Sequence, residues 1–125
     1  MKVILSIKPE FVEKIFSGEK RFEYRKSIFK QRDIDTIIIY STMPVGMIVG
    51  EFKFKTIHAD SPKMIWKETK KYSGITKDFF YDYFKNKETA FAIEIEKVHK
   101  YKKPLNPYTI FTNFTAPQSF CYLEN

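Results

Sequence analysis

The feature that most constrains the fold is the apolar run DTIIIYS at residues 35–41. Consecutive isoleucines followed by a tyrosine are typical of a strand inside a sheet, because no polar face is left for water. A second run, KVILSI at residues 2–7, is also β-branched and apolar and predicts another strand. The protein is therefore expected to be built on a sheet in which 35–41 is a central strand.

Helix signals separate the predicted strands. Residues 9–17 begin with a proline, which the first helical turn tolerates, and are followed by Gly18, which supplies a left-handed stop. Two further helices are predicted at 60–72, which opens with Asp-Ser-Pro, and at 74–87, which opens with Thr76 as a cap. The aromatic residues of these two segments recur at helical spacing, which favours the core over the alternative, a platform on which bases stack: Trp66, Tyr72, Phe79, Phe80, Tyr83 and Phe84.

The remaining strand signals complete a curled sheet. Residues 20–25 and 89–101 alternate, residues 46–57 form a long strand with a bulge or bend at Gly50, and residues 119–123 close the sheet. The order is strand, helix, several strands, two helices and strands. It predicts an α+β fold, with a small β-barrel or curled mixed sheet and short flanking helices.

Composition narrows the class of protein. The sequence has no linker and no internal repeat, so residues 1–125 are expected to form a single domain, with a monomer favoured. One cysteine, Cys121, excludes an internal disulfide and is interpreted as a buried thiol. His58 and His99 lie far apart, and we predict no metal site and no cofactor. No segment approaches the ~20 apolar residues of a membrane span, so we expect a cytoplasmic protein.

The net charge of +7 is the strongest functional signal in the composition. Lysine and arginine gather in residues 19–32 and again in EKVHKYKKP at residues 96–104. Clustered positive charge favours a polyanion such as RNA as the partner. A basic surface without a binding role is the alternative.

The stretch SGEKRFEYRK at residues 17–26 contains the main candidate site. In a strand, Phe22 and Tyr24 point to one side, where we expect them to be buried, and Glu23 and Arg25 share the opposite, outer face. The arginine guanidinium can donate two parallel hydrogen bonds to a phosphate. A nearby carboxylate can accept a hydrogen bond from the amino group of a base. Glu23 and Arg25 are therefore predicted to pair or to share a ligand, unless they form only an exposed ion pair.

Five further residues are predicted to complete the site. Lys20 points away in a regular strand, so it reaches the site only from the turn that precedes the strand. Lys8 follows the first predicted strand and lies next to a helix N-terminus, which is a candidate binding site for an anion. Ser41 follows the central strand and is expected at the floor of the cleft, and Gln118 and Ser119 are expected to read a base. Solvation and local hydrogen bonding are the alternative roles.

The stretch LSIKPEFVEKIFSGEKRFEYRK resembles the opening of the ASCH domain, a member of the PUA-like superfamily. The pattern is a strand that ends in Lys-Pro, a short helix and Gly-x-Lys-x-x-Glu-x-Arg, here Lys8, Pro9, Gly18, Lys20, Glu23 and Arg25. IYSTMPVGMIVGEF and APQSFCYL are similar to later segments of the family. The resemblance runs from Lys2 to Leu123.

This resemblance implies a small PUA-like β-barrel with flanking helices, a cleft lined by the motif, and RNA or a nucleotide-like ligand as partner. Some members of the family hydrolyse an amide on acetylated cytidine, and at least one is reported to cut RNA. In the amidohydrolase branch a threonine stands at the position of Glu23, and a carboxylate near that of Ser73. Because this chain departs at both positions, we do not extend the amidohydrolase activity to it.

Two functions follow from the sequence. The favoured one is a non-catalytic RNA- or nucleotide-binding module with a basic cleft. The alternative is a small hydrolase acting on a modified nucleoside or on RNA, with Lys20 as activating base or electrophile and Glu23 as proton carrier. Lys20 can act as a base only with a lowered pKa, which burial or neighbouring cations provide.

Overall fold

The computed structural model describes residues 1–30 and 33–123, so Arg32 of the predicted basic cluster lies outside the described residues. The elements are β1 (Lys2–Ile7), α1 (Pro9–Ser17), β2 (Phe22–Arg25), β3 (Thr36–Ser41), β4 (Met47–Asp60), α2 (Pro62–Thr69), a 3-10 turn (Lys70–Tyr72), α3 (Lys77–Tyr83), β5 (Ala90–Leu105), α4 (Pro107–Ile110) and β6 (Phe120–Leu123). Among these residues, no helix is long and apolar enough to cross a membrane.

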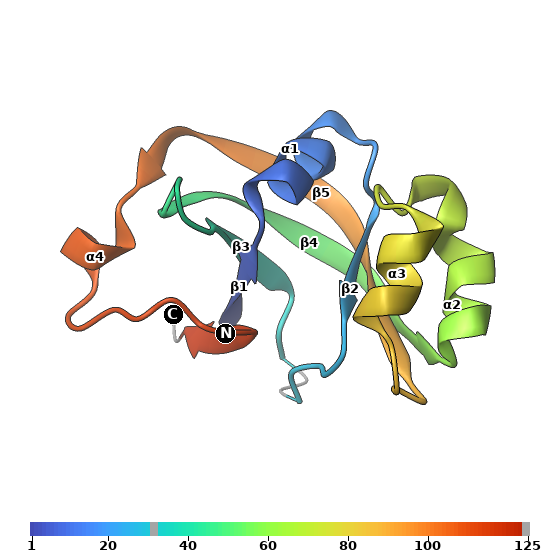
Figure 1. The fold of residues 1–125 in the computed structure, drawn as a ribbon. Helices are drawn as coiled ribbons and strands as arrows, with labels where there is room; N and C mark the ends of the chain where they lie inside the picture. The colour runs from blue at the N-terminus through green and yellow to red at the C-terminus, as the bar shows by residue number, and fades with distance from the viewer. Residues whose placement is uncertain (31–32, 124–125) are drawn as a thin grey trace.

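The strands of the described residues form one sheet in the order β2-β5-β4-β3-β1-β6 (Figure 1). β1 and β3 are parallel and the other pairs are antiparallel, so the sheet is mixed. The sheet curls into a half-barrel, with α1 against one end and α2 and α3 side by side along one flank. The predicted α+β fold with a curled mixed sheet and short helices is confirmed.

The apolar run of β3 is buried on both of its faces. Ile37 and Ile39 lie in the main core together with residues of β1 and α1. Ile38 and Tyr40 point to the opposite face, where they pack in a second cluster against residues of the C-terminal segment. A strand covered on both sides has no place for an alternating polar residue, which explains the unbroken run of apolar residues.

Several element boundaries differ from the sequence prediction. β4 and β5 extend further than expected, to Asp60 and to Leu105, and pair antiparallel along much of their length. The predicted helix at 60–72 is shorter because α2 passes into a 3-10 turn at Lys70. The helix predicted at 74–87 is limited to α3, which begins after its cap at Thr76 and ends at Tyr83. The expected irregularity at Gly50 is present, since the pairing of β4 with both neighbours shifts there. A side chain at Gly50 would meet the His99 carbonyl oxygen at 2.6 Å.

The aromatic residues of α2 and α3 divide between the core and a cavity. Phe80 and Phe84 are buried, and Trp66 packs on Phe80 with 4.9 Å between ring centroids. Phe79, in contrast, is 37% exposed, and Tyr83 is half-buried. Assigning every one of these aromatic residues to the core is therefore wrong for Phe79, because the face of α3 that carries it lies over a cavity rather than over the sheet.

Candidate functional site

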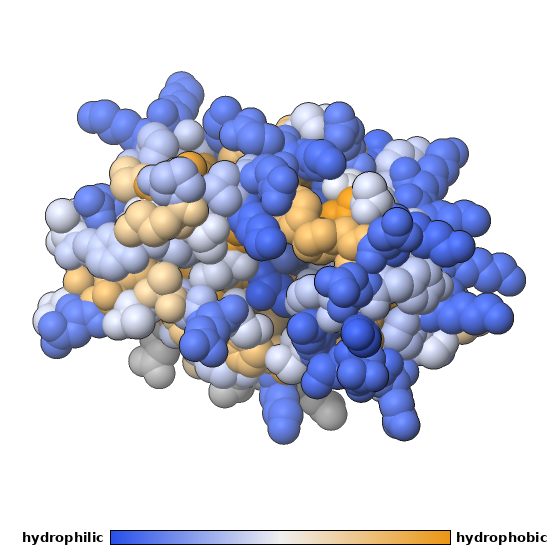
Figure 2. Space-filling model, viewed as in Figure 1, coloured by the Kyte–Doolittle hydropathy of each residue, from blue (hydrophilic) through white to orange (hydrophobic). Residues whose placement is uncertain are grey.

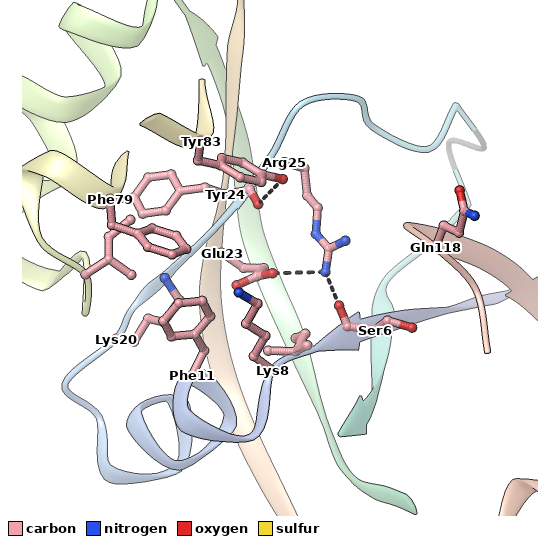
Figure 3. Close-up of a pocket in the computed structure, with 12 residues that line it drawn as sticks. Ser6, Lys8, Phe11, Lys20, Glu23, Tyr24, Arg25, Phe79, Tyr83 and Gln118 are labelled. Carbon is pink, nitrogen blue, oxygen red and sulfur yellow. Dashed lines mark hydrogen bonds and ion pairs between the residues drawn. The ribbon is translucent and has the colours of Figure 1, made fainter. Parts of the chain in front are cut away.

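A cavity of about 240 Å³ opens between the end of β1, α1, β2 and α3 (Figure 3). Charged residues, aromatic rings and a few smaller side chains line it, namely Lys8, Lys20, Glu23, Arg25, Phe11, Tyr24, Phe79, Tyr83, Ser6, Ile7, Ile75 and Gln118. Figure 2 shows the protein in the same orientation as Figure 1. Hydrophilic residues cover most of the face turned toward the viewer, with hydrophobic residues exposed between them. The cavity is thus a basic pocket with aromatic walls.

Arg25 joins three parts of the chain at the edge of this cavity. Its Nη2 donates to the Glu23 carboxylate at 3.0 Å and to the Ser6 carbonyl at 2.8 Å, and its Nη1 donates to the Ser119 carbonyl at 3.1 Å. β2 and β1 are not neighbours in the sheet, so the bond to Ser6 connects the end of β2 to β1 (Figure 3). The bond to Ser119 connects it to the segment before β6. Arg25 holds the open side of the half-barrel together.

The predicted outer face of β2 is not exposed. Glu23 and Arg25 do lie on the same side and do pair, as the alternation predicts. Both are nevertheless buried, at 6% and 7% exposure, because the end of β1 and the Ser119 segment cover them. Tyr24 is buried on the other side, whereas Phe22 is only half-buried. The pair is a buried interaction in which each partner needs the other, rather than a solvated ion pair.

Lys20 is the most deeply buried cation of the cavity, with 2% of its surface exposed. It lies in the turn before β2, as its predicted role requires, and its Nζ donates to the Ser73 carbonyl at 2.8 Å. The ammonium also lies 4.7 Å from the Tyr24 ring centroid and 5.3 Å from that of Phe11. Burial and ring contacts place this charge at the inner end of the cavity.

The surroundings of Lys20 lower its pKa from 10.5 to about 8. Desolvation by burial is the main cause, because the charged ammonium loses its water. The Glu23 carboxylate opposes this shift, and the positive charges of Lys14 and Arg25 add to it. Near pH 8, Lys20 therefore exists both as a charged donor and as a neutral amine.

The other predicted residues divide into those at the cavity and those away from it. Lys8 is exposed at the rim, with its Nζ 5.5 Å from the Phe79 ring centroid, and Gln118 also lines the cavity. Ser119 does not line it and contributes only its carbonyl oxygen to Arg25. Ser41 is buried but does not form the floor. The prediction for Ser41 is wrong because β1 lies between β3 and the open side of the half-barrel.

Aromatic residues are the part of the site that the sequence analysis assigned to the core instead. Phe79 and Tyr83 are one helical turn apart on α3, with ring planes 10° from parallel and centroids 6.5 Å apart. Lys8 lies over the first ring, and Lys26 lies 4.7 Å from the centroid of the second. Their helical spacing was a signal for a shared face, but it does not say whether that face meets the core or a cavity.

The fold and the cavity define a small α+β half-barrel with a basic, aromatic-walled pocket. The model of the ASCH domain family matches residues 5–99, and the chain belongs to that family.

Relatives of known structure or name agree with this assignment. A solved ASCH structure from Zymomonas mobilis superposes with a TM-score of 0.91 at 27% identity, covering 98% of this chain and 87% of that one. An ASCH domain-containing ribonuclease from Zymomonas mobilis is 29% identical over 126 residues, which is 98% of this chain and 84% of the relative. A Ureaplasma parvum protein named ATP synthase subunit alpha is 28% identical over 123 residues. This chain spans only 15% of that protein's length.

The contacts of Arg25 predict a large loss of stability when its side chain is removed. In Arg25→Ala, Glu23 keeps a buried charge without its partner and two carbonyls lose their donor, so we expect the free energy of unfolding to fall by about 3–5 kcal/mol. Arg21→Ala is the control, because Arg21 is exposed and stacks on Tyr72 at 4.2 Å, and it should cost only about 0.5–1 kcal/mol. Urea unfolding measures both, and equal losses would contradict the role of Arg25.

Proposed function

We propose that this protein binds RNA and takes a nucleotide unit into the cavity between β1, α1, β2 and α3. The single observation that carries the proposal is the grouping of Lys8, Lys20 and Arg25 around one carboxylate, Glu23, beside aromatic walls. Lysine ammonium groups bind phosphate, and aromatic rings stack on the faces of bases. The name of the Zymomonas mobilis relative, a ribonuclease, supports RNA as the ligand.

The geometry divides the work of binding among these residues. Lys8 is exposed at the rim and is free to meet a backbone phosphate. Phe79 and Tyr83 offer ring faces beside it for a base. Glu23 uses Oε2 for its bond to Arg25, which leaves Oε1 to accept from a base amino group. Arg25 already donates hydrogen bonds to the Ser6 and Ser119 carbonyls, so it contributes to the site mainly by positioning Glu23 rather than by binding phosphate.

The net charge of +7 adds a long-range attraction for RNA to the contacts made in the cavity. A positive surface raises the rate at which a polyanion meets the protein, and the effect weakens with salt. The affinity for RNA is therefore expected to fall as the salt concentration rises, with a logarithmic slope of about 0.7 for each phosphate contacted in a single strand.

Lys8 provides a direct test of this proposal. Lys8→Gln removes one rim charge without disturbing the core, so the affinity for a labelled RNA should fall and its salt slope should decrease by about 0.7. Lys53→Gln is the control, because Lys53 is equally exposed on β4 but does not line the cavity. Fluorescence anisotropy at several salt concentrations measures both slopes. Equal effects of the two substitutions, or an affinity independent of salt, would contradict binding at the cavity.

Hydrolysis of RNA is a second candidate, favoured by the pKa of about 8 at Lys20. A buried lysine that loses its proton near pH 8 can serve as a general base, with Glu23 as the proton carrier. The arrangement does not favour amide hydrolysis. Ser73 stands near the position of the amidohydrolase carboxylate, and its hydroxyl donates to the Ile75 carbonyl at 3.0 Å.

A search for product separates binding from catalysis. If the protein only binds, labelled RNA and acetylated cytidine should be recovered intact after incubation. If it hydrolyses RNA, the rate should rise with pH through about 8 as Lys20 loses its proton, and both Lys20→Met and Glu23→Gln should lose most of the turnover. Lys20→Met purified in parallel controls for contaminating nucleases. If the wild type hydrolyses RNA and Lys20→Met does not, the binding-only proposal is wrong and hydrolysis takes its place.

A further inference from the structure

The turn at residues 72–75 presents three successive carbonyl groups to α1 and to the segment that joins it to β2. The joining segment donates two bonds, from the Arg21 amide to the Tyr72 carbonyl at 2.8 Å and from Lys20 Nζ to the Ser73 carbonyl at 2.8 Å. The third bond comes from α1, where Lys14 Nζ donates to the Gly74 carbonyl at 3.0 Å. The Ser73 hydroxyl bonds within the turn to the Ile75 carbonyl. The turn is therefore fixed against the side chain of Lys20 by bonds on both sides of it.

Gly74 is the member of this turn that touches the stem of Lys20. Its backbone is left-handed, with φ +69°, and a Cβ placed there would meet the Lys20 Cβ at 2.6 Å, Cγ at 2.8 Å and Cδ at 3.1 Å. The first two distances are shorter than any ordinary carbon contact, so either the turn or Lys20 would have to move. The missing side chain at Gly74 leaves the space through which the lysine stem passes.

The position of this contact determines where the charge of Lys20 lies. The stem crosses Gly74, and the ammonium beyond it lies near the Phe11 and Tyr24 rings and bonds to Ser73. Because the stem is buried along its length, it has no free rotamer space in which to absorb a shift. A displaced stem takes the ammonium out of the inner end of the cavity.

We propose that Gly74 is a positioning residue for the cavity, one whose lack of a side chain sets where the Lys20 ammonium lies. The proposal rests on the proposed function for the role it gives Lys20 in RNA binding. The steric part of the inference stands on the geometry of the turn alone. The two parts can therefore be tested by separate measurements.

Gly18 offers a matched control. It is also left-handed, with φ +86°, but a Cβ there would meet nothing within 4 Å. Gly74→Ala and Gly18→Ala thus impose the same kind of backbone strain, and only Gly74→Ala adds a collision with Lys20. We expect Gly74→Ala to lower the Tm further than Gly18→Ala. In a Lys20→Gly background, which removes every side-chain atom of the collision, the two substitutions should lower the Tm equally.

The titration of Lys20 is the readout that a purely structural defect would not move. The charged groups that act on it are Glu23, which raises its pKa, and Lys14 and Arg25, which lower it. A displaced ammonium regains water, so its pKa should rise from about 8 toward 10.5 in Gly74→Ala and stay at about 8 in Gly18→Ala. NMR of isotopically methylated lysines measures this without any ligand.

The affinity for a labelled RNA completes the test. We expect Gly74→Ala to bind as weakly as Lys20→Met, and the double variant Gly74→Ala/Lys20→Met to bind no more weakly than either single variant. If RNA does not bind the wild type, the proposed function fails, while the Tm cycle and the Lys20 titration still decide the role of Gly74. Additive Tm losses together with an unchanged Lys20 titration in Gly74→Ala would overturn the inference.

Discussion

The bonds of Arg25 are the interaction on which the rest of the structure depends. The sheet order leaves β2 at one edge and β6 beyond β1 at the other, so within residues 1–30 and 33–123 no backbone ladder closes the half-barrel between them. Arg25 spans this opening with bonds to the Ser6 and Ser119 carbonyls, and Glu23 holds its guanidinium from β2. A planar fork suits this task because it donates in several fixed directions at once. Arg25 bridges the open side of the half-barrel at one end only. The part of the opening that no side chain fills is the cavity.

The inner end of the cavity combines positive charge with poor access to water. Lys8, Lys20 and Arg25 line the cavity, Glu23 is the one carboxylate that lines it among the described residues, and that carboxylate is already paired with Arg25. Burial and neighbouring cations both disfavour the protonated form of Lys20, and its lowered pKa is the result. An anionic ligand would relieve the same imbalance by restoring negative charge beside the ammonium. Perturbed titration of this kind is common at functional sites.

Local patterns in the sequence predicted the parts of the site that depend on local geometry. Strand alternation places Glu23 and Arg25 on one side, and the turn before β2 carries Lys20 into the cavity. The partners of Arg25 could not be predicted, because Ser6 and Ser119 are 19 and 94 residues away along the chain and meet it only when the sheet curls. The burial of the ion pair follows from the same long-range contacts.

The errors have a shared physical origin. The sequence shows that Ser41 ends a buried strand and that Phe79 shares a helix face with Tyr83, but not which element covers each one. Strand order decides the first case and the tilt of α3 over the cavity decides the second. Both are set by packing between distant segments, which a periodic pattern does not encode.

The pH dependence of RNA affinity tests the central claim, that the Lys20 ammonium contributes to the site, most directly. With a pKa of about 8, Lys20 is largely charged at pH 7 and about one-tenth charged at pH 9, so the affinity of the wild type should fall between them, by about tenfold at most. The RNA should contain only adenine and cytosine, which do not titrate in this range. Lys20→Met should bind more weakly and without this dependence. An equal affinity at pH 7 and pH 9 in the wild type would contradict the account.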